Sequence, residues 1–224
     1  MFNGYENKLI QGYEDKAPKK WAIIASGPSL TPEDVNAVRG MNVIVINTSH
    51  WLAPWADILY ACDPHWWDWH YQNPEWKAKL DAFQGEKWTQ DKDAAKKYGL
   101  NFIESKAGGG ISTDPKIIYQ GSNSGVQAIN LAYHCGARDI ILLGYDMQGS
   151  KDKPHWHGHH PSKIVSGWHA WLKFYDLVAA DAAKLGVRIT NCTRQTALTC
   201  FERMNLEQAL SLAPARHSQK ALSQ

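Results

Sequence analysis

The chain has 224 residues, a hydrophobic fraction of 44% and a formal net charge of +2, which is enough for one large domain with a buried core. A charge so close to zero, without a long basic run, excludes nucleic-acid binding that depends on a strong overall positive charge. No apolar run approaches the roughly 18 residues that cross a bilayer, and the first twenty residues lack the apolar region of a signal peptide. The four cysteines form no Cys-x-x-Cys pair, so we expect reduced thiols in a cytoplasmic protein.

Buried strands alternate with helices along the chain. Continuous apolar stretches predict strands at 21–25, 43–46, 56–64, 140–143 and 187–193. Helices are predicted after Thr31, with Pro32 at the first helical position, over 73–88, from Asn123 or Ser124 to about Cys135, and over 166–186. Residues 101–105 are a further candidate strand, and 107–115 read as a flexible loop.

This alternation predicts an α/β fold. We expect a Rossmann-like open, mostly parallel sheet with helices on both faces and a small lid region. Residues 1–213 then form a single nucleotide-binding domain, with a lid or insert at about 148–167 and a disordered tail at 214–224. Ligands in such sheets bind at the carboxyl ends of the strands, where polar residues stand: Ser26, Asn47, Asp63, Asp146 and Asn191.

Two glycine-containing turns are candidate phosphate sites. "ASGPSL" contains Ser26, Gly27, Pro28 and Ser29, and "GSNSG" contains Asn123, Ser124 and Gly125. A glycine lets the backbone approach a ligand, and a helix N-terminus offers N–H groups to a phosphate. Neither turn matches G-x-G-x-x-G or a P-loop. A tight turn and a well-capped helix are the structural alternatives.

The stretch "HWHGHH" concentrates four histidines at 155–160. It has three interpretations: a zinc site, a general base beside a nucleotide cleft, or a solvated polar loop. The spacing is unusual for structural zinc, and no partner cysteine or carboxylate pair is evident, so no metal ligand is assigned. Four of the eleven tryptophans lie in 55–70. Their rings either pack in the core and lid or form a platform for a base or sugar ring.

Several of these motifs together resemble a known family. "IIASGPSL", "INTSHW", "YACDP", "NSGVQAINLAYHCGARDIILLGYDM" and "GHH", in this order, resemble the bacterial sialyltransferases of glycosyltransferase family 42. More broadly they resemble a superfamily with motility-associated flagellin glycosyltransferases and an archaeal 6-hydroxymethylpterin pyrophosphokinase. The resemblance spans roughly residues 20 to 201 and is strongest over 123–147.

The resemblance implies an inverting, metal-independent transferase that needs no cofactor. Its substrates would be a nucleotide-activated sugar, linked to cytidine monophosphate in the family, and a hydroxyl-bearing acceptor. The family's general base falls on His159, and nucleotide-binding positions are matched at Asn47 and Ser124. Family members often form oligomers, so a homo-oligomer is expected, without a membrane span.

The sequence departs from the family at several positions. Two family asparagines fall on Ser26 and Asp63, and one leaving-group tyrosine falls on Gln148. The other tyrosine falls near His155 or Trp156, so His155 or His157 is left to donate that hydrogen bond.

Two alternative functions remain open at this point. One is a Mg²⁺-dependent pyrophosphoryl transferase, with Asp63 and Asp146 as metal ligands. The other is a non-catalytic nucleotide-binding module.

Overall fold

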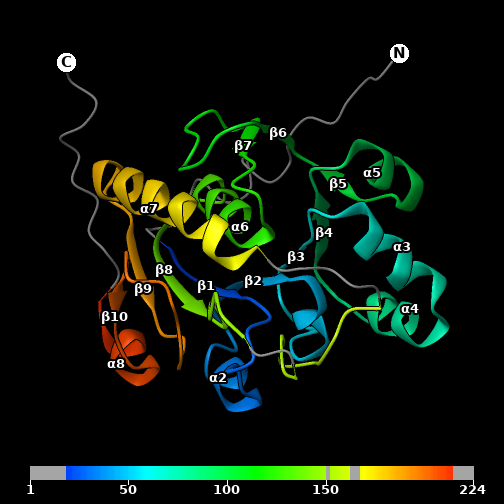
Figure 1. The fold of residues 1–224 in the computed structure, drawn as a ribbon, viewed down its shortest axis with the longest axis horizontal. Coiled ribbons are helices and arrows are strands. Elements are labelled where there is room, and N and C mark those ends of the chain that lie inside the picture. The colour runs from blue at the N-terminus through cyan, green and yellow to red at the C-terminus, as the bar shows by residue number, and fades with distance from the viewer. Residues whose placement is uncertain (1–18, 150–151, 162–166, 214–224) are drawn as a thin grey trace.

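The computed structural model describes residues 19–149, 152–161 and 167–213 (Figure 1). The expected tail at 214–224 and the first 18 residues of the expected domain lie outside the described residues, as do 150–151 and 162–166 of the expected lid.

The strands and helices follow one another in an α/β pattern. The strands are β1 (Lys19–Ile24), β2 (Asn42–Ile46), β3 (Ile58–Tyr60), β4 (Glu86–Thr89), β5 (Asn101–Phe102), β6 (Glu104–Lys106), β7 (Ile117–Tyr119), β8 (Ala137–Leu143), β9 (Arg188–Asn191) and β10 (Glu202–Arg203). The helices are α2 (Pro32–Ala37), the 3₁₀ helix η1 (Asn47–Trp51), α3 (Pro64–Gln72), α4 (Pro74–Asp81), α5 (Lys92–Tyr98), α6 (Ser124–His134), α7 (Trp168–Leu185) and α8 (Leu206–Ser211).

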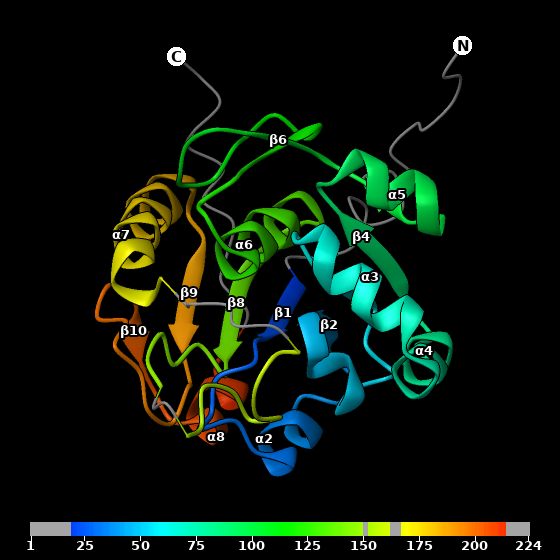
Figure 2. The same cartoon turned by 45° about the vertical axis from the view of Figure 1, so that its right-hand side comes forward.

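The predicted parallel sheet is confirmed. Within the described residues, eight strands pair in the order β10-β9-β8-β1-β2-β3-β4-β5, and every pairing is parallel. The chain builds outward from β1 to β5 and then returns to the other side of β1 with β8. This reversal between β1 and β8 is the point where open α/β sheets bind ligands. Figure 2 shows β8 and β9 running in the same direction, toward the loop that follows β8.

Helices cover both faces of the sheet, as the sequence predicts. Alternate residues of β1 point to opposite sides: Trp21 and Ile23 pack in the core beneath α6 and α7, whereas Ala22 and Ile24 pack with the helices of the other face. The second core contains residues from α2, α3, α4, α5 and α8. Strands buried on both faces account for the continuous apolar runs in the sequence.

The helix ends follow local chemistry that the sequence reveals. Thr31 caps α2 in a capping box with Asp34, and Pro32 is its first residue. Gly186 ends α7 with a left-handed φ of 66°, and Gly136 follows α6 with a φ of 85°. Both glycines adopt a conformation that costs other residues energy.

Two regions differ from the sequence predictions. The helix expected over 73–88 ends at Asp81, and Glu86–Thr89 form β4 instead. The prediction was wrong there because Trp88 completes a core strand beside Tyr60, a pairing that local periodicity does not reveal. The strand expected at 101–105 is divided between β5 and β6, which belong to different sheets.

Three of the four tryptophans in the tryptophan-rich stretch, Trp66, Trp67 and Trp69, lie in α3, a helix that the sequence analysis did not assign. Asp63 caps it, accepting a hydrogen bond from the N–H of His65 at 2.9 Å. Trp67 is fully buried and Trp66 is 2% exposed, so packing accounts for these two. No helix within the described residues is long and apolar enough to span a membrane.

Candidate functional site

A cleft opens at the switch point between β1 and β8. It has a volume of about 250 Å³, and we call it the central cleft. Its walls are the carboxyl ends of β1, β2, β3 and β8, the N-terminus of α6, the start of α7 and part of the loop at 155–160, which we call the histidine loop. Among the residues that the sequence analysis singled out, it is lined by Ser26, Gly27, Asn47, Asp63, Asn123, Ser124, Gly125, Gln148 and His155.

Other predicted residues lie in two neighbouring hollows. Pro28, Ser29 and Asp146 line a larger cavity of about 670 Å³, the side cavity; among the described residues, Gln148 is the one that lines both this cavity and the central cleft. His157 and His159 line a small hollow of about 50 Å³, the histidine pocket. The predicted site is therefore divided: most nucleotide-binding candidates come together, but His159 does not line the cleft that contains them.

Strained backbone is concentrated in the central cleft. Among the described residues, the non-glycine residues with a left-handed φ are Asn47 at 52°, Ser122 at 59° and Met147 at 49°. All three line this cleft. Such conformations cost about 1–3 kcal/mol each and are typical of functional sites. Their coincidence here distinguishes the central cleft from the larger side cavity.

The first turn, after β1, is fixed against β8. The N–H groups of Ala25 and Gly27 donate to the carbonyls of Leu143 and Gly144, both at 2.8 Å. A Cβ on Gly27 would lie 2.0 Å from Asp146 Oδ1 and 2.5 Å from the Gly144 carbonyl oxygen. Only glycine fits this close approach, which is the role that the sequence predicted for it.

The second turn forms the N-terminus of α6. Asn123 caps the helix, and Ser124 Oγ accepts a hydrogen bond from the Cys62 N–H at 3.1 Å. Gly125 is required, because a Cβ there would lie 2.3 Å from the Tyr175 hydroxyl oxygen. The first N–H groups of a helix have no partner within it, so this end of α6 can receive an anionic group.

Asn123 makes more bonds than an ordinary cap, and this gives a testable prediction. Its side chain accepts from the Val126 N–H at 3.1 Å and from the Tyr175 hydroxyl at 2.9 Å, and donates to the Gly121 carbonyl at 2.9 Å. Asn123→Ala should lower the free energy of unfolding by about 2 kcal/mol. The control is Asn205→Ala, which removes the cap of α8 and should cost about 1 kcal/mol. Equal losses in urea unfolding would contradict the extra role of Asn123.

Ser26 connects the end of β1 to the segment that follows β2, where Asn47 lies. Ser26 Oγ lies 3.0 Å from Ser49 Oγ and 3.3 Å from the Ile46 carbonyl. Asn47 Oδ1 is buried and has no hydrogen-bond partner among the described residues. A buried polar atom without a partner is costly, so this oxygen is suited to accept a hydrogen bond from a ligand.

Two imidazoles of the histidine loop reach the central cleft. These are His155 and His160, whose ring centroids are 4.6 Å apart. Burial lowers the pKa of His155 to about 4. Burial also lowers the pKa of His160, whereas the neighbouring Asp63 carboxylate acts to raise it. His160 was missed as a site residue, although it stands in the same "GHH" motif.

His157 of the same loop is half-buried and packs on Trp51, which also contacts the buried His50 and His70. Nδ1 of His50 and of His70 each lies 2.9 Å from a backbone carbonyl, of Asn47 and Trp66 respectively. A carbonyl only accepts, so both Nδ1 atoms carry the proton and both Nε2 atoms present a lone pair. Burial lowers the pKa to about 3 for His50 and His157 and to about 4 for His70.

Aromatic side chains that the sequence analysis did not assign also line the central cleft. Trp69 comes from α3, whereas Trp168 and Trp171 come from α7. Trp66 of the same helix also lines the cleft, although it is only 2% exposed, so the platform interpretation of the tryptophan-rich stretch stays a prediction for Trp66 and Trp69. Sequence periodicity could not identify Trp168 and Trp171, because residues distant in the chain meet only in the folded protein.

The two carboxylates considered as metal ligands do not share a cavity. Asp63 lines the central cleft, whereas Asp146 lines the side cavity. Within residues 19–149, 152–161 and 167–213, no three histidine, cysteine or acidic side chains are grouped so that they could hold a metal ion.

Comparison with known proteins gives no relative: the chain matches no protein-family model, no curated protein and no solved structure.

Proposed function

We propose that the chain is a nucleotide-sugar-dependent glycosyltransferase, inverting and metal-independent, of the kind that the family 42 sialyltransferases represent. The observation that carries the proposal is the central cleft: three strained residues, two glycine turns and the N-terminus of α6 converge at the sheet's switch point. This combination suits a nucleotide, with its phosphate at the helix N-terminus.

The transfer requires a base for the acceptor. The oxygen of an acceptor hydroxyl attacks the anomeric carbon of the donor sugar. The bond between that carbon and the phosphate oxygen breaks, and its electron pair leaves with the nucleotide phosphate. The hydroxyl proton passes to a neutral imidazole.

We assign that imidazole to His160 rather than to His159. His160 lines the central cleft, and the nearby Asp63 carboxylate favours the imidazolium that forms. His159 is exposed and lines the histidine pocket but not the central cleft.

The histidines give a prediction with an internal control. His160→Ala should lower turnover about 100-fold, the usual contribution of a general base, whereas His159→Ala should leave it unchanged. The measurement is transfer from a cytidine monophosphate sugar to lactose, with chain stability checked by thermal unfolding. Full activity in His160→Ala together with loss of activity in His159→Ala would identify His159 as the general base, as the family resemblance implies.

The nucleotide class is tested by thermal unfolding with a ligand panel. Cytidine, uridine, guanosine and adenosine mono- and diphosphates and triphosphates are compared, each with Mg²⁺ and with EDTA. A ligand at 100 times its Kd adds about 2.7 kcal/mol, or several degrees for a chain of this size.

The panel distinguishes metal-independent nucleotide binding from Mg²⁺-dependent pyrophosphoryl transfer, and the transfer assay above separates the glycosyltransferase from a non-catalytic nucleotide-binding module. We expect a shift with cytidine monophosphate that persists in EDTA. A shift seen only with a di- or triphosphate and Mg²⁺ would favour pyrophosphoryl transfer instead. No shift with any nucleotide would contradict the glycosyltransferase proposal.

A further inference from the structure

Tyr175, a residue of α7, contacts the N-terminus of α6. Its side chain is 1% exposed and lines the central cleft, and its hydroxyl donates a hydrogen bond to Asn123 Oδ1 at 2.9 Å. The hydroxyl lies directly against the first turn of α6, since a Cβ on Gly125 would lie 2.3 Å from the hydroxyl oxygen. A residue more than fifty positions along the chain therefore contacts the turn that would hold the nucleotide phosphate.

Asn123 connects this contact to the strained turn before α6. Its Oδ1 also accepts from the Val126 N–H at 3.1 Å, and its Nδ2 donates to the Gly121 carbonyl at 2.9 Å. Two donors on Oδ1 and one acceptor for Nδ2 fix the carboxamide in a single orientation. The residue enclosed by these bonds, Ser122, has a left-handed φ of 59°. Such a conformation persists only where the surrounding contacts enforce it.

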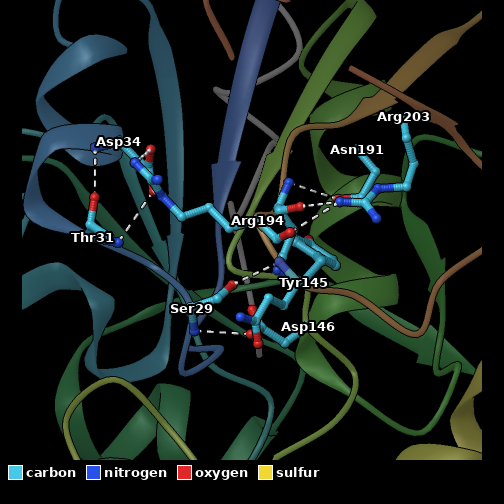
Figure 3. Close-up of polar contacts among 10 residues, drawn as sticks. Ser29, Thr31, Asp34, Tyr145, Asp146, Asn191, Arg194 and Arg203 are labelled. Atoms are coloured by element: carbon cyan, nitrogen blue, oxygen red, sulfur yellow. Dashed lines mark hydrogen bonds and ion pairs between the residues drawn. The ribbon is translucent and has the colours of Figure 1, made fainter. Parts of the chain in front are cut away.

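The ring of Tyr175 packs against a second tyrosine, Tyr145, which follows β8. Their ring centroids are 6.0 Å apart and the rings are inclined by 85°, an edge-to-face arrangement that stabilises aromatic pairs. The Tyr145 hydroxyl donates to the Gly125 carbonyl at 3.1 Å. Figure 3 shows Tyr145 beside Asp146, whose carboxylate accepts from the Ser29 N–H at 2.9 Å. The segment after β8 is therefore bonded to both glycine turns and gives Tyr175 a fixed neighbour.

Tyr175 shares one face of α7 with two tryptophans of the central cleft. Trp168, Trp171 and Tyr175 are spaced by three and four residues, so they lie on the same side of the helix. All three line the central cleft. The helix that supplies part of the aromatic wall of the cleft is thus also bonded to the turn before α6.

We propose that Tyr175 is a positioning residue of the phosphate site. Its hydroxyl acts through Asn123: it keeps the turn at 121–123 in its strained form, so that the first N–H groups of α6 keep the direction in which they can meet a phosphate. The identity of the ligand rests on the proposed function, whereas the effect of Tyr175 on the turn is a property of the chain alone.

Tyr175→Phe removes only the hydroxyl, and Tyr60→Phe is its matched control. Tyr60 is also fully buried, and its hydroxyl also donates to a carboxamide oxygen of α6, Gln127 Oε1, at 2.8 Å. Gln127 lies a turn further along the helix, outside the residues that line the central cleft. Tyr175→Phe should weaken the binding of cytidine monophosphate about tenfold in calorimetric titration, the effect of one lost hydrogen bond. Tyr60→Phe should leave the affinity unchanged, with a similar loss of stability in urea unfolding.

Two further measurements show whether Tyr175 acts through Asn123. In the double variant Tyr175→Phe/Asn123→Ala, the loss of affinity should be no larger than in Asn123→Ala, because the second substitution removes the partner of the first. Amide hydrogen exchange at Ser122 and Ser124, measured in the nucleotide-free chain, should be faster in Tyr175→Phe than in Tyr60→Phe.

The outcomes separate this inference from the proposed function. It is supported if Tyr175→Phe alone weakens nucleotide binding, if the losses in the double variant do not add, and if exchange at the turn becomes faster. It is overturned if the two tyrosine variants bind nucleotide equally, or if the losses in the double variant add. If the unsubstituted chain binds no nucleotide, the transferase is refuted and hydrogen exchange decides the inference. Faster exchange at the turn in Tyr175→Phe alone would then support the positioning role, and equal exchange in both variants would overturn it.

Discussion

Gly27→Ala is expected to lower the free energy of unfolding by about 3 kcal/mol, the upper range for forcing atoms into a packed site. The added Cβ would lie 2.5 Å from the Gly144 carbonyl oxygen, and that carbonyl belongs to the backbone after β8, so no side-chain rotation relieves the contact. The turn would have to move away from β8 and break the 2.8 Å bond between the Gly27 N–H and the Gly144 carbonyl. Nucleotide binding in the central cleft should be lost with it.

Gly40→Ala supplies the control for this prediction. Gly40 has a left-handed φ of 92°, but nothing lies within 4 Å of the position of its Cβ. Alanine there should cost only about 1 kcal/mol of backbone strain. Urea unfolding of both variants measures the difference, with equal m-values showing that the unfolded state is unchanged. Equal losses, or a Gly27→Ala protein that binds nucleotide normally, would contradict the assigned role of the turn.

Acid should destabilise the protein steeply below about pH 6.5 through His50, His70 and His157. Burial lowers the pKa of each in the folded chain, to about 3, 4 and 3, whereas an unfolded histidine has a pKa of about 6.5. Between these values the unfolded chain binds more protons, so stability rises with pH. Each histidine contributes about 1.4 kcal/mol per pH unit. Three together can remove the roughly 5–15 kcal/mol of a typical fold before pH 4.

A single substitution tests this linkage. His70→Asn removes one titrating group, and the asparagine amide can still donate to the Trp66 carbonyl as Nδ1 does. The slope of unfolding free energy between pH 6 and pH 4.5 should fall by about 1.4 kcal/mol per pH unit. His169→Asn, at an exposed position of α7, should leave the slope unchanged. An unchanged slope in His70→Asn would show that His70 does not titrate as its burial implies.

Much of the architecture is determined locally and could be predicted from the sequence. The apolar runs at 21–25 and 140–143 become β1 and β8 because a strand covered on both faces needs no polar alternation. Thr31 with Pro32, Asn123, and Gly186 determine helix ends through hydrogen bonds and backbone conformations within a few residues of each cap. The polar residues after the strands come together because parallel strands place their carboxyl ends on one edge.

Other features depend on contacts between distant segments, which no local pattern contains. Glu86–Thr89 form a strand because they pair with β3. Ser122 and Met147 adopt strained backbone, and Trp168 joins the central cleft, only once α6, β8 and α7 are packed around β1. The histidine loop shows the limit most clearly: its spacing cannot separate His159 from His160. The packing of 155–161 against α3 and η1 places the half-buried His157 beside Trp51 and His160 at the central cleft, because each imidazole must find space among side chains from other parts of the chain.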